Sequence, residues 1–170
     1  MQRQQGITLV ELLVVLAILA IMVGVVFPGF QNMLARNNMA TSANSVLLAV
    51  NLARGEAVRQ ADTTTLVALG GGAADDEWGV GWQVLNVAAT TPATPCAAPA
   101  CIREFGPISG ALTLDSPANQ TFLQFNSRGG LVGGVPVVLN LCNPGVDGVQ
   151  VAVTAVGRAS TSPLGPGDCP

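Results

Sequence analysis

The pattern of apolar and polar positions divides the chain into three parts. After a short polar start, residues 7–27 are apolar with a single charge, Glu11. A helix of roughly 20 apolar residues can span a bilayer. Beyond residue 29, apolar positions recur at steps of three and four, the spacing of one helix face; they are Ala43, Val46, Val50, Ala53 and Ala57. The pattern predicts one helix over residues 7–60: a membrane-spanning part, 7–28, and an amphipathic part, 29–60.

Polar residues lie between these apolar positions and suit the wet face of that helix: Asn44, Asn51, Arg54 and Arg59. Pro28 predicts a kink, because proline removes a helical hydrogen bond and clashes with the preceding turn.

A secretory signal peptide is the rival interpretation of the apolar run. Such a peptide has an apolar region of roughly 7–15 residues followed by a small-residue cleavage site. This run is longer, and no such site follows it.

Residues 61–170 form the third part, where the apolar positions alternate. The alternation predicts short strands separated by Gly, Pro, Asn and Asp clusters; they are Thr63–Leu69, Gly79–Leu85, Ala111–Leu114, Thr121–Asn126, Val135–Leu141 and Val149–Val156. We therefore expect an α+β fold, in which an antiparallel β-sheet domain packs on the amphipathic half of the long N-terminal helix. Two stretches are expected as surface loops, Ala88–Ala100 and Ser160–Pro170, and a third, Gly70–Glu77, as a flexible acidic loop.

The composition removes most routes to catalysis. The chain has no His, no Lys and no Tyr, and its charged residues are seven Arg against ten acids. Without His there is no ordinary Ser–His or Cys–His nucleophile and no histidine metal ligand. We expect no enzyme activity, no cofactor and no metal. A membrane-bound enzyme on this scaffold would lack catalytic groups.

The four cysteines are even in number and lie in the C-terminal half, which indicates disulfides in an oxidising compartment. Zinc sites usually use closely spaced cysteine pairs, and these spacings do not match that pattern. Four cysteines allow three pairings. We predict Cys96–Cys101, which closes a short Pro-containing loop, and Cys142–Cys169, which ties down a tail without core residues.

The N-terminus resembles the prepilin processing site. Gly6 is followed by Ile7-Thr8-Leu9-Val10-Glu11 after a short charged leader, the order found in type IV pilins and type II secretion pseudopilins. The resemblance implies a leader, 1–6, that a prepilin peptidase removes between Gly6 and Ile7 before N-methylating Ile7. Ile7 departs from the usual Phe. The rival interpretation is an ordinary membrane anchor with an accidental Glu.

Three further fragments resemble the GspH/FimT/FimU minor pilins and pseudopilins. They are Leu52–Arg59 at the predicted helix end, Trp78-Gly79-Val80-Gly81-Trp82, and the turns Phe125–Gly129 and Val156–Arg158. The resemblance implies a subunit that primes or caps a type IV pilus or secretion pseudopilus. Its partners would be other major and minor pilins or pseudopilins, the peptidase and the inner-membrane assembly platform.

The expected location is the bacterial inner membrane, as a single-pass protein whose C-terminal domain is periplasmic, and later the filament tip. Arg3 precedes the apolar run, and no basic cluster follows it, so the N-terminus is expected in the cytoplasm.

Two groups of residues have a binding and a structural interpretation. Resemblance to the FimT branch implies DNA binding through Arg158, with Arg128 as a second candidate, in natural transformation. Few arginines release few counterions, so we favour a structural Arg158 that caps a strand end or pairs with Asp168. Trp78 and Trp82 could stack on a ligand, but large aromatics of a small domain more often fill its core.

Glu11 is the residue that the assembly hypothesis depends on. A carboxylate in a lipid-embedded helix is costly unless something pairs with it. The amine of Ile7, in the same chain or in a neighbouring subunit, is the expected partner. The alternative to such pairing is that the Glu11 side chain extends to the lipid headgroups and has no role in assembly.

Overall fold

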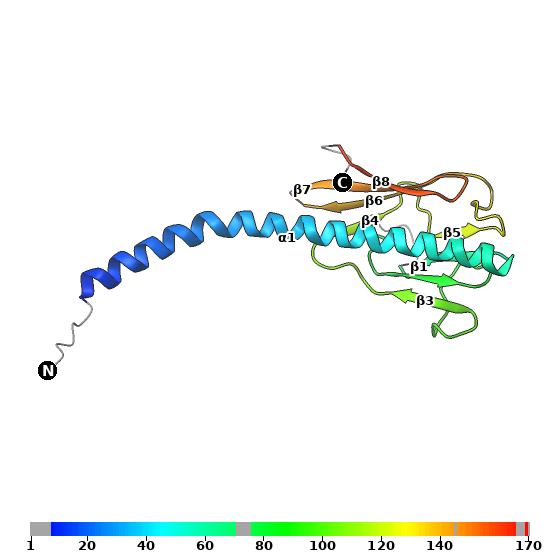
Figure 1. The fold of residues 1–170 in the computed structure, drawn as a ribbon, viewed down its shortest axis with the longest axis horizontal. Helices are drawn as coiled ribbons and strands as arrows, with labels where there is room; N and C mark the ends of the chain where they lie inside the picture. The colour runs from blue at the N-terminus through cyan, green and yellow to red at the C-terminus, as the bar shows by residue number, and fades with distance from the viewer. Residues whose placement is uncertain (1–7, 71–75, 145, 166–168, 170) are drawn as a thin grey trace.

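The computed structural model describes residues 8–70, 76–144, 146–165 and 169, and the side chains of residues 25–29 lie outside this description. One helix, α1 (Leu9–Gln60), runs from the N-terminal side into the domain, and its first half projects away from the strands (Figure 1). The backbone stays helical through Pro28. The helix is therefore not interrupted at Pro28, and Figure 1 shows a gentle curve in this half of the helix in place of the predicted kink.

The helix ends where the sequence predicts, and its end has a defined backbone geometry. Ala61 lies in the left-handed region, with φ of 55° and ψ of 30°. Its N–H faces the carbonyl oxygens of Ala57 and Val58, and the N–H of Asp62 donates to Ala57 at 3.2 Å. This is the Schellman type of helix end, which satisfies the last carbonyl groups and usually has Gly at the left-handed position.

The domain has two antiparallel sheets, whereas the sequence predicted one. The first has the strand order β3-β2-β1-β5 and the second β4-β6-β7-β8. The strands are β1 (Thr64–Ala68), β2 (Trp82–Leu85), β3 (Cys101–Phe105), β4 (Thr113–Asp115), β5 (Phe122–Phe125), β6 (Val137–Asn143), β7 (Val146–Val153) and β8 (Ala159–Pro163). All six predicted strands overlap an observed one, and β3 and β8 were not predicted. The α+β class is confirmed.

The core lies where the second half of α1 covers both sheets. The five apolar helix positions expected at the interface are all buried, and Met39 and Ala49 extend the same face. Four of these seven buried apolar positions are alanines, so the helix backbone can approach the strands closely. Opposite them lie inward-facing residues of both sheets, which include Leu66, Leu123, Phe125, Leu139, Leu141, Val151 and Val153.

The segment 86–100 lies at the surface, as predicted for Ala88–Ala100, but it packs along the outer face of the first sheet, which was not predicted. Side chains of three different strands bind its main chain. Thr65 Oγ1 donates to Val87 O and accepts from Ala89 N, Gln83 exchanges two hydrogen bonds with Ala93, and Gln124 donates to Ala89 O. A second small core of Val67, Leu85 and Cys101 lies beneath the segment. We call residues 86–100 the strap.

The C-terminal stretch also differs from its prediction. Its first residues form β8, which pairs with β7, and Leu164 is buried and donates its N–H to Gly148 O at 2.9 Å. The tail therefore has a core residue. A Cβ at Gly148 would lie 2.6 Å from Cys169 Sγ and 2.9 Å from Leu164 Cδ1, so this position requires Gly to let the tail cross β7.

The predicted acidic loop Gly70–Glu77 lies partly outside the described residues, which resume at Asp76. Its described acids are structural. Asp76 Oδ1 accepts a hydrogen bond from Leu114 N at 2.7 Å. Glu77 is buried, with Oε2 3.4 Å from Ser116 N. Glu77 is therefore not a surface residue, in contrast to the prediction.

Candidate functional site

The N-terminal half of α1 is an apolar rod that the domain leaves uncovered. From Leu9 to Leu34 the large apolar side chains of described residues are all at least half exposed. Burial against the domain starts at Met39. Exposed apolar area on this scale is rare on soluble monomers and marks an interaction surface. Among the residues that the structure describes, no helix meets the length and hydropathy required of a membrane span.

Glu11 lies in the first turn of this rod and is exposed. Thr8 caps the helix: its backbone is extended and its Oγ1 accepts a hydrogen bond from the N–H of Glu11 at 3.3 Å. Thr-x-x-Glu at a helix start is the capping-box pattern, and a carboxylate in the first turn also interacts favourably with the helix dipole. This signal is present in the sequence, although the capping role of Thr8 was not predicted from it. Gly6 and Ile7 lie outside the described residues.

The far end of α1 forms a junction with two loops. Arg54 Nε donates to Gly129 O at 3.1 Å. A Cβ at Gly129 would come within about 3 Å of Arg54 and Val58, and one at Gly157 would collide with the carbonyl oxygen of Gly129. Leu131 N also donates to Ala155 O at 2.9 Å. Three fragments that were separate in the sequence, Leu52–Arg59, Phe125–Gly129 and Val156–Arg158, therefore meet here, and we call this contact the junction.

Positive φ values explain the glycines of the junction. Gly129 and Gly157 have φ of 77° and 75°, in the region that L side chains rarely adopt. The turns around them are closed by short-range hydrogen bonds. In the first, Asn126 Oδ1 accepts from Arg128 N. In the second, the N–H and the hydroxyl of Thr154 donate to Arg158 O, and Arg158 N donates to Thr154 Oγ1. Both glycines are needed for the close approach of the two loops to Arg54.

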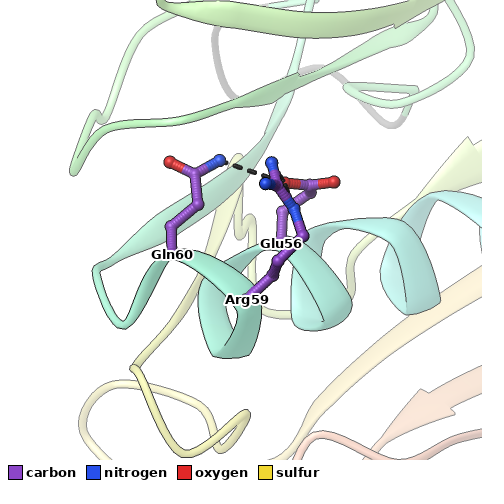
Figure 2. A network of polar contacts seen from close by, with 3 residues as sticks. All are labelled: Glu56, Arg59 and Gln60. Atoms are coloured by element: carbon purple, nitrogen blue, oxygen red, sulfur yellow. Dashed lines mark hydrogen bonds and ion pairs between the residues drawn. The ribbon is translucent and has the colours of Figure 1, made fainter.

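The last turn of α1 holds a small polar network (Figure 2). Glu56 Oε2 accepts hydrogen bonds from Arg59 Nε at 2.9 Å and Gln60 Nε2 at 3.0 Å, and Arg59 Nη2 also donates to it. The hydrogen bonds from Arg59, followed by that from Gln60, lower the pKa of the Glu56 carboxyl, and the same contact raises the pKa of Arg59. The charge of Arg59 is thereby partly neutralised.

The two candidate DNA-binding residues lie on adjacent loops. Arg128 and Arg158 are exposed and each neighbours a junction glycine. The main chain of Arg158 closes the turn between β7 and β8, and its proposed partner Asp168 is outside the described residues. Arg103 lies on β3, at the opposite edge of the first sheet from β5, where its guanidinium sits 4.8 Å above the Phe105 ring.

The two tryptophans are core residues, as predicted. Trp78 is fully buried, and its Nε1 donates to Gln120 O at 2.8 Å. Trp82 is 1% exposed and stacks on Phe105, with ring centroids 5.7 Å apart. Gly81, which precedes Trp82, allows the chain to pass close to Phe105: it has φ of 121°, and a Cβ there would lie 2.5 Å from Phe105 O.

The cysteines form the two pairs expected from the sequence. Cys96 is bonded to Cys101 and Cys142 to Cys169, with Cα–Cα distances of 5.2 and 5.7 Å. The thiols are therefore not available as metal ligands. Within the described ranges, no group of His, Cys, Asp and Glu residues is arranged to hold a metal ion.

Comparison with known families agrees with this architecture. The model of the Type II transport protein GspH matches residues 42–157, which include the junction except Arg158, and the prokaryotic N-terminal methylation motif matches residues 1–27. The chain belongs to the GspH family. It is thus a member of the minor pilins and pseudopilins of type IV pili and type II secretion, a structural rather than an enzymatic family.

Solved structures of a type IV minor pilin share the fold of this GspH-family chain. The type IV minor pilin FimU of Pseudomonas aeruginosa matches in two crystal forms, each with a TM-score of 0.61. Identity is 24% and 23%, over 78% and 76% of this chain and 91% and 98% of FimU. The minor pseudopilin EpsH from the type 2 secretion system of Vibrio cholerae matches with a TM-score of 0.47 and 17% identity, over 77% of this chain and 99% of EpsH. No curated protein matches significantly.

Proposed function

We propose that this chain is a minor subunit that enters a type IV pilus or a secretion pseudopilus through the apolar half of α1. The carrying observation is the uncovered rod: between Leu9 and Leu34, the large apolar side chains that the structure describes are exposed. Before assembly, residues 7–28 span the inner membrane and the domain, residues 61–170, lies in the periplasm. In the filament, the same side chains pack on other major and minor pilins or pseudopilins. The two disulfides fit a periplasmic domain.

Processing precedes assembly in this proposal. A prepilin peptidase cuts between Gly6 and Ile7 and N-methylates Ile7, and the methylation motif matched over residues 1–27 supports this step. Mass spectrometry of the membrane form should show loss of residues 1–6 and the gain of one methyl group. An intact Met1 in assembled filaments would contradict the proposal.

Glu11 sets the axial register between neighbouring subunits. The methylated amine of Ile7 keeps its positive charge, and in an adjacent subunit it can pair with this carboxylate inside the bilayer or the filament. Pairing offsets the cost of a lipid-embedded charge, which is on the order of 2–3 kcal/mol at a helix centre and less toward its end. The cap that Thr8 provides holds Glu11 in the first turn of the helix.

Glu11→Val tests the assembly role. The variant should insert and be cleaved like the wild type, yet fail to enter or prime the filament, as measured by immunoblotting of sheared filaments. Glu11→Gln keeps the size and removes only the charge, so it should share the defect. Incorporation of either variant at wild-type levels would show that Glu11 is only tolerated.

A position at the filament tip, where the subunit primes or caps assembly, follows from the minor-pilin hypothesis. Deletion of the chain should reduce the number of filaments more than their length if it primes assembly. Filament counts by electron microscopy, with complementation by wild type and by Glu11→Val, measure this. An unchanged number of filaments would remove the priming role.

DNA binding is the second candidate function, because the junction brings together the loops that carry Arg128 and Arg158. We do not favour it. Two exposed arginines neutralise few phosphates, and affinity for DNA rises with that number. The formal net charge of −3 adds no general attraction for nucleic acid.

A further inference from the structure

A cavity of about 580 Å³ opens between α1 and the second sheet, at the end of the domain from which the apolar rod projects. Its volume falls in the range of small-molecule sites, roughly 300–1,000 Å³. Asn32 and Arg36 line it from the helix, Thr113 lines it from β4, and Asp147 lines it from β7. The Cys142–Cys169 disulfide forms another part of its wall.

Two opposite charges line this cavity without meeting. Arg36 and Asp147 are exposed, and neither makes an ion pair or a side-chain hydrogen bond with any other residue in the described part of the chain. The charged groups of Glu56 and Arg59, in contrast, are joined directly. The cavity therefore offers one guanidinium and one carboxylate, each with its hydrogen-bonding capacity free for a ligand.

The cavity lies close to the membrane surface if residues 7–28 span the bilayer, so this inference rests on the proposed function. At a rise of 1.5 Å per residue, Asn32 lies about 6 Å and Arg36 about 12 Å beyond residue 28 along the helix. The headgroup layer on each side of a bilayer is roughly 5–8 Å thick, from the difference between total and hydrocarbon thickness. Asn32 is thus level with the headgroups. Arg36 starts one turn above them, and because long side chains of a helix point back toward its N-terminus, the guanidinium can extend toward the phosphate level.

We propose that this cavity binds the zwitterionic headgroup of a phospholipid that carries a primary amine, the phosphoethanolamine type. The guanidinium of Arg36 matches the phosphate, for which arginine is well shaped. The carboxylate of Asp147 accepts hydrogen bonds from the ammonium group, which has three N–H donors. A choline headgroup lacks these donors, and a glycerol headgroup brings no positive charge to Asp147. Of these three headgroups, only the one with the primary amine satisfies both charged groups of the cavity.

The test is native mass spectrometry of the full chain, delipidated in detergent and titrated with single lipids. The lipids are phosphatidylethanolamine, phosphatidylcholine and phosphatidylglycerol with identical acyl chains. We expect about tenfold tighter binding of the ethanolamine lipid, the effect of one hydrogen bond to a charged group. Arg36→Gln and Asp147→Asn should each abolish this selectivity. Arg128→Gln, which removes the same charge at the far end of the domain, should leave it unchanged.

Four outcomes would overturn the proposal. Equal binding of all three lipids would show that the cavity does not distinguish headgroups. Selectivity that survives both variants would show that Arg36 and Asp147 do not determine it. A preference for phosphatidylglycerol that only Arg36→Gln removes would indicate an anion site. Binding of soluble glycerophosphoethanolamine as tight as that of the lipid would place the ligand outside the membrane. Membrane extraction and filament incorporation, measured on the same variants, test the proposed function separately.

Discussion

Arg54 of the helix donates a hydrogen bond to the main-chain oxygen of Gly129, 75 positions away in the sequence, at 3.1 Å. The same side chain lies 3.3 Å from the Cβ position of Gly157. The side chain of Arg54 therefore contacts both the loop after β5 and the turn after β7. Because β5 belongs to the first sheet and β7 to the second, this side chain links α1 to both sheets.

Arg54→Met keeps most of the aliphatic stem and removes the donor, so it should destabilise the domain by about 1.5–3 kcal/mol, the range for a hydrogen bond to a charged group. Urea unfolding of a soluble fragment from Gln31 onward measures the change. Arg128→Met, at an exposed position of the same junction, is the matched control and should stay within about 0.5 kcal/mol. Equal effects of the two variants would show that Arg54 does not hold the junction.

Two glycine-to-alanine changes should have opposite signs. Gly157→Ala places a Cβ against Gly129 O at a positive φ, so it should cost more than about 1 kcal/mol. Gly55→Ala lies in the helix with open space around it and should add about 0.8–1 kcal/mol through helix propensity. Thermal unfolding of both variants measures the effects. A stabilised Gly157→Ala variant would contradict the close approach of the two loops.

The stability contributed by Glu56 should depend on pH. Its hydrogen bonds lower its pKa in the folded state, so the contribution is fully present above the unfolded pKa, near 4.3, and is lost as pH falls through the folded value. Glu56→Gln should therefore be less stable than wild type at pH 7 and equal to it at the lowest pH. Arg59→Gln should show the same pH dependence, and the double variant should add little. A Glu56→Gln deficit that persists at low pH would indicate lost packing instead.

Removing the disulfides should reveal which one fixes the tail. On the chain-entropy model, loss of Cys142–Cys169, with its sequence separation of 27, costs about 3.5 kcal/mol, and loss of Cys96–Cys101, with a separation of 5, costs about 2 kcal/mol. Paired Cys→Ser variants measured by urea unfolding compare them. Peptide mapping without reduction checks the pairing, and a Cys96–Cys142 link would contradict it.

Any binding of DNA should be weak and sensitive to salt. With Arg128 and Arg158 as contacts, the slope of log K against log salt should not exceed about 2, and Arg158→Ala should halve it. Gel shifts of the soluble fragment at two salt concentrations measure this, and Arg36→Ala, at the other end of the domain, is the control. Tight binding at physiological salt would mean that a broader basic surface operates.

The sequence predicted the helix and most strands because both depend on local patterns. Strand β3 was missed because its middle residues, Arg103 and Glu104, are exposed at a sheet edge and carry no apolar alternation. Strand β8, with the sequence ASTSP, has almost no apolar side chains and depends on its pairing with β7.

The division into two sheets and the contact of Arg54 with Gly129 could not be predicted from local patterns, because both depend on pairing between distant segments. The resemblance of Leu52–Arg59, Phe125–Gly129 and Val156–Arg158 to family fragments indicated that these places matter, but not that they touch. The cavity beside Arg36 and Asp147 likewise requires the fold, since 111 positions separate the two residues.

The strap has a consequence for how this protein can vary in nature. Thr65, Gln83 and Gln124 bind the strap only through main-chain atoms of residues 87–93, and Thr90, Thr91 and Thr94 are exposed to solvent. Mutations at these three threonines leave every one of those contacts in place. The path of the strap therefore does not depend on these three side chains, and the chemistry of this surface can change while the backbone stays as it is.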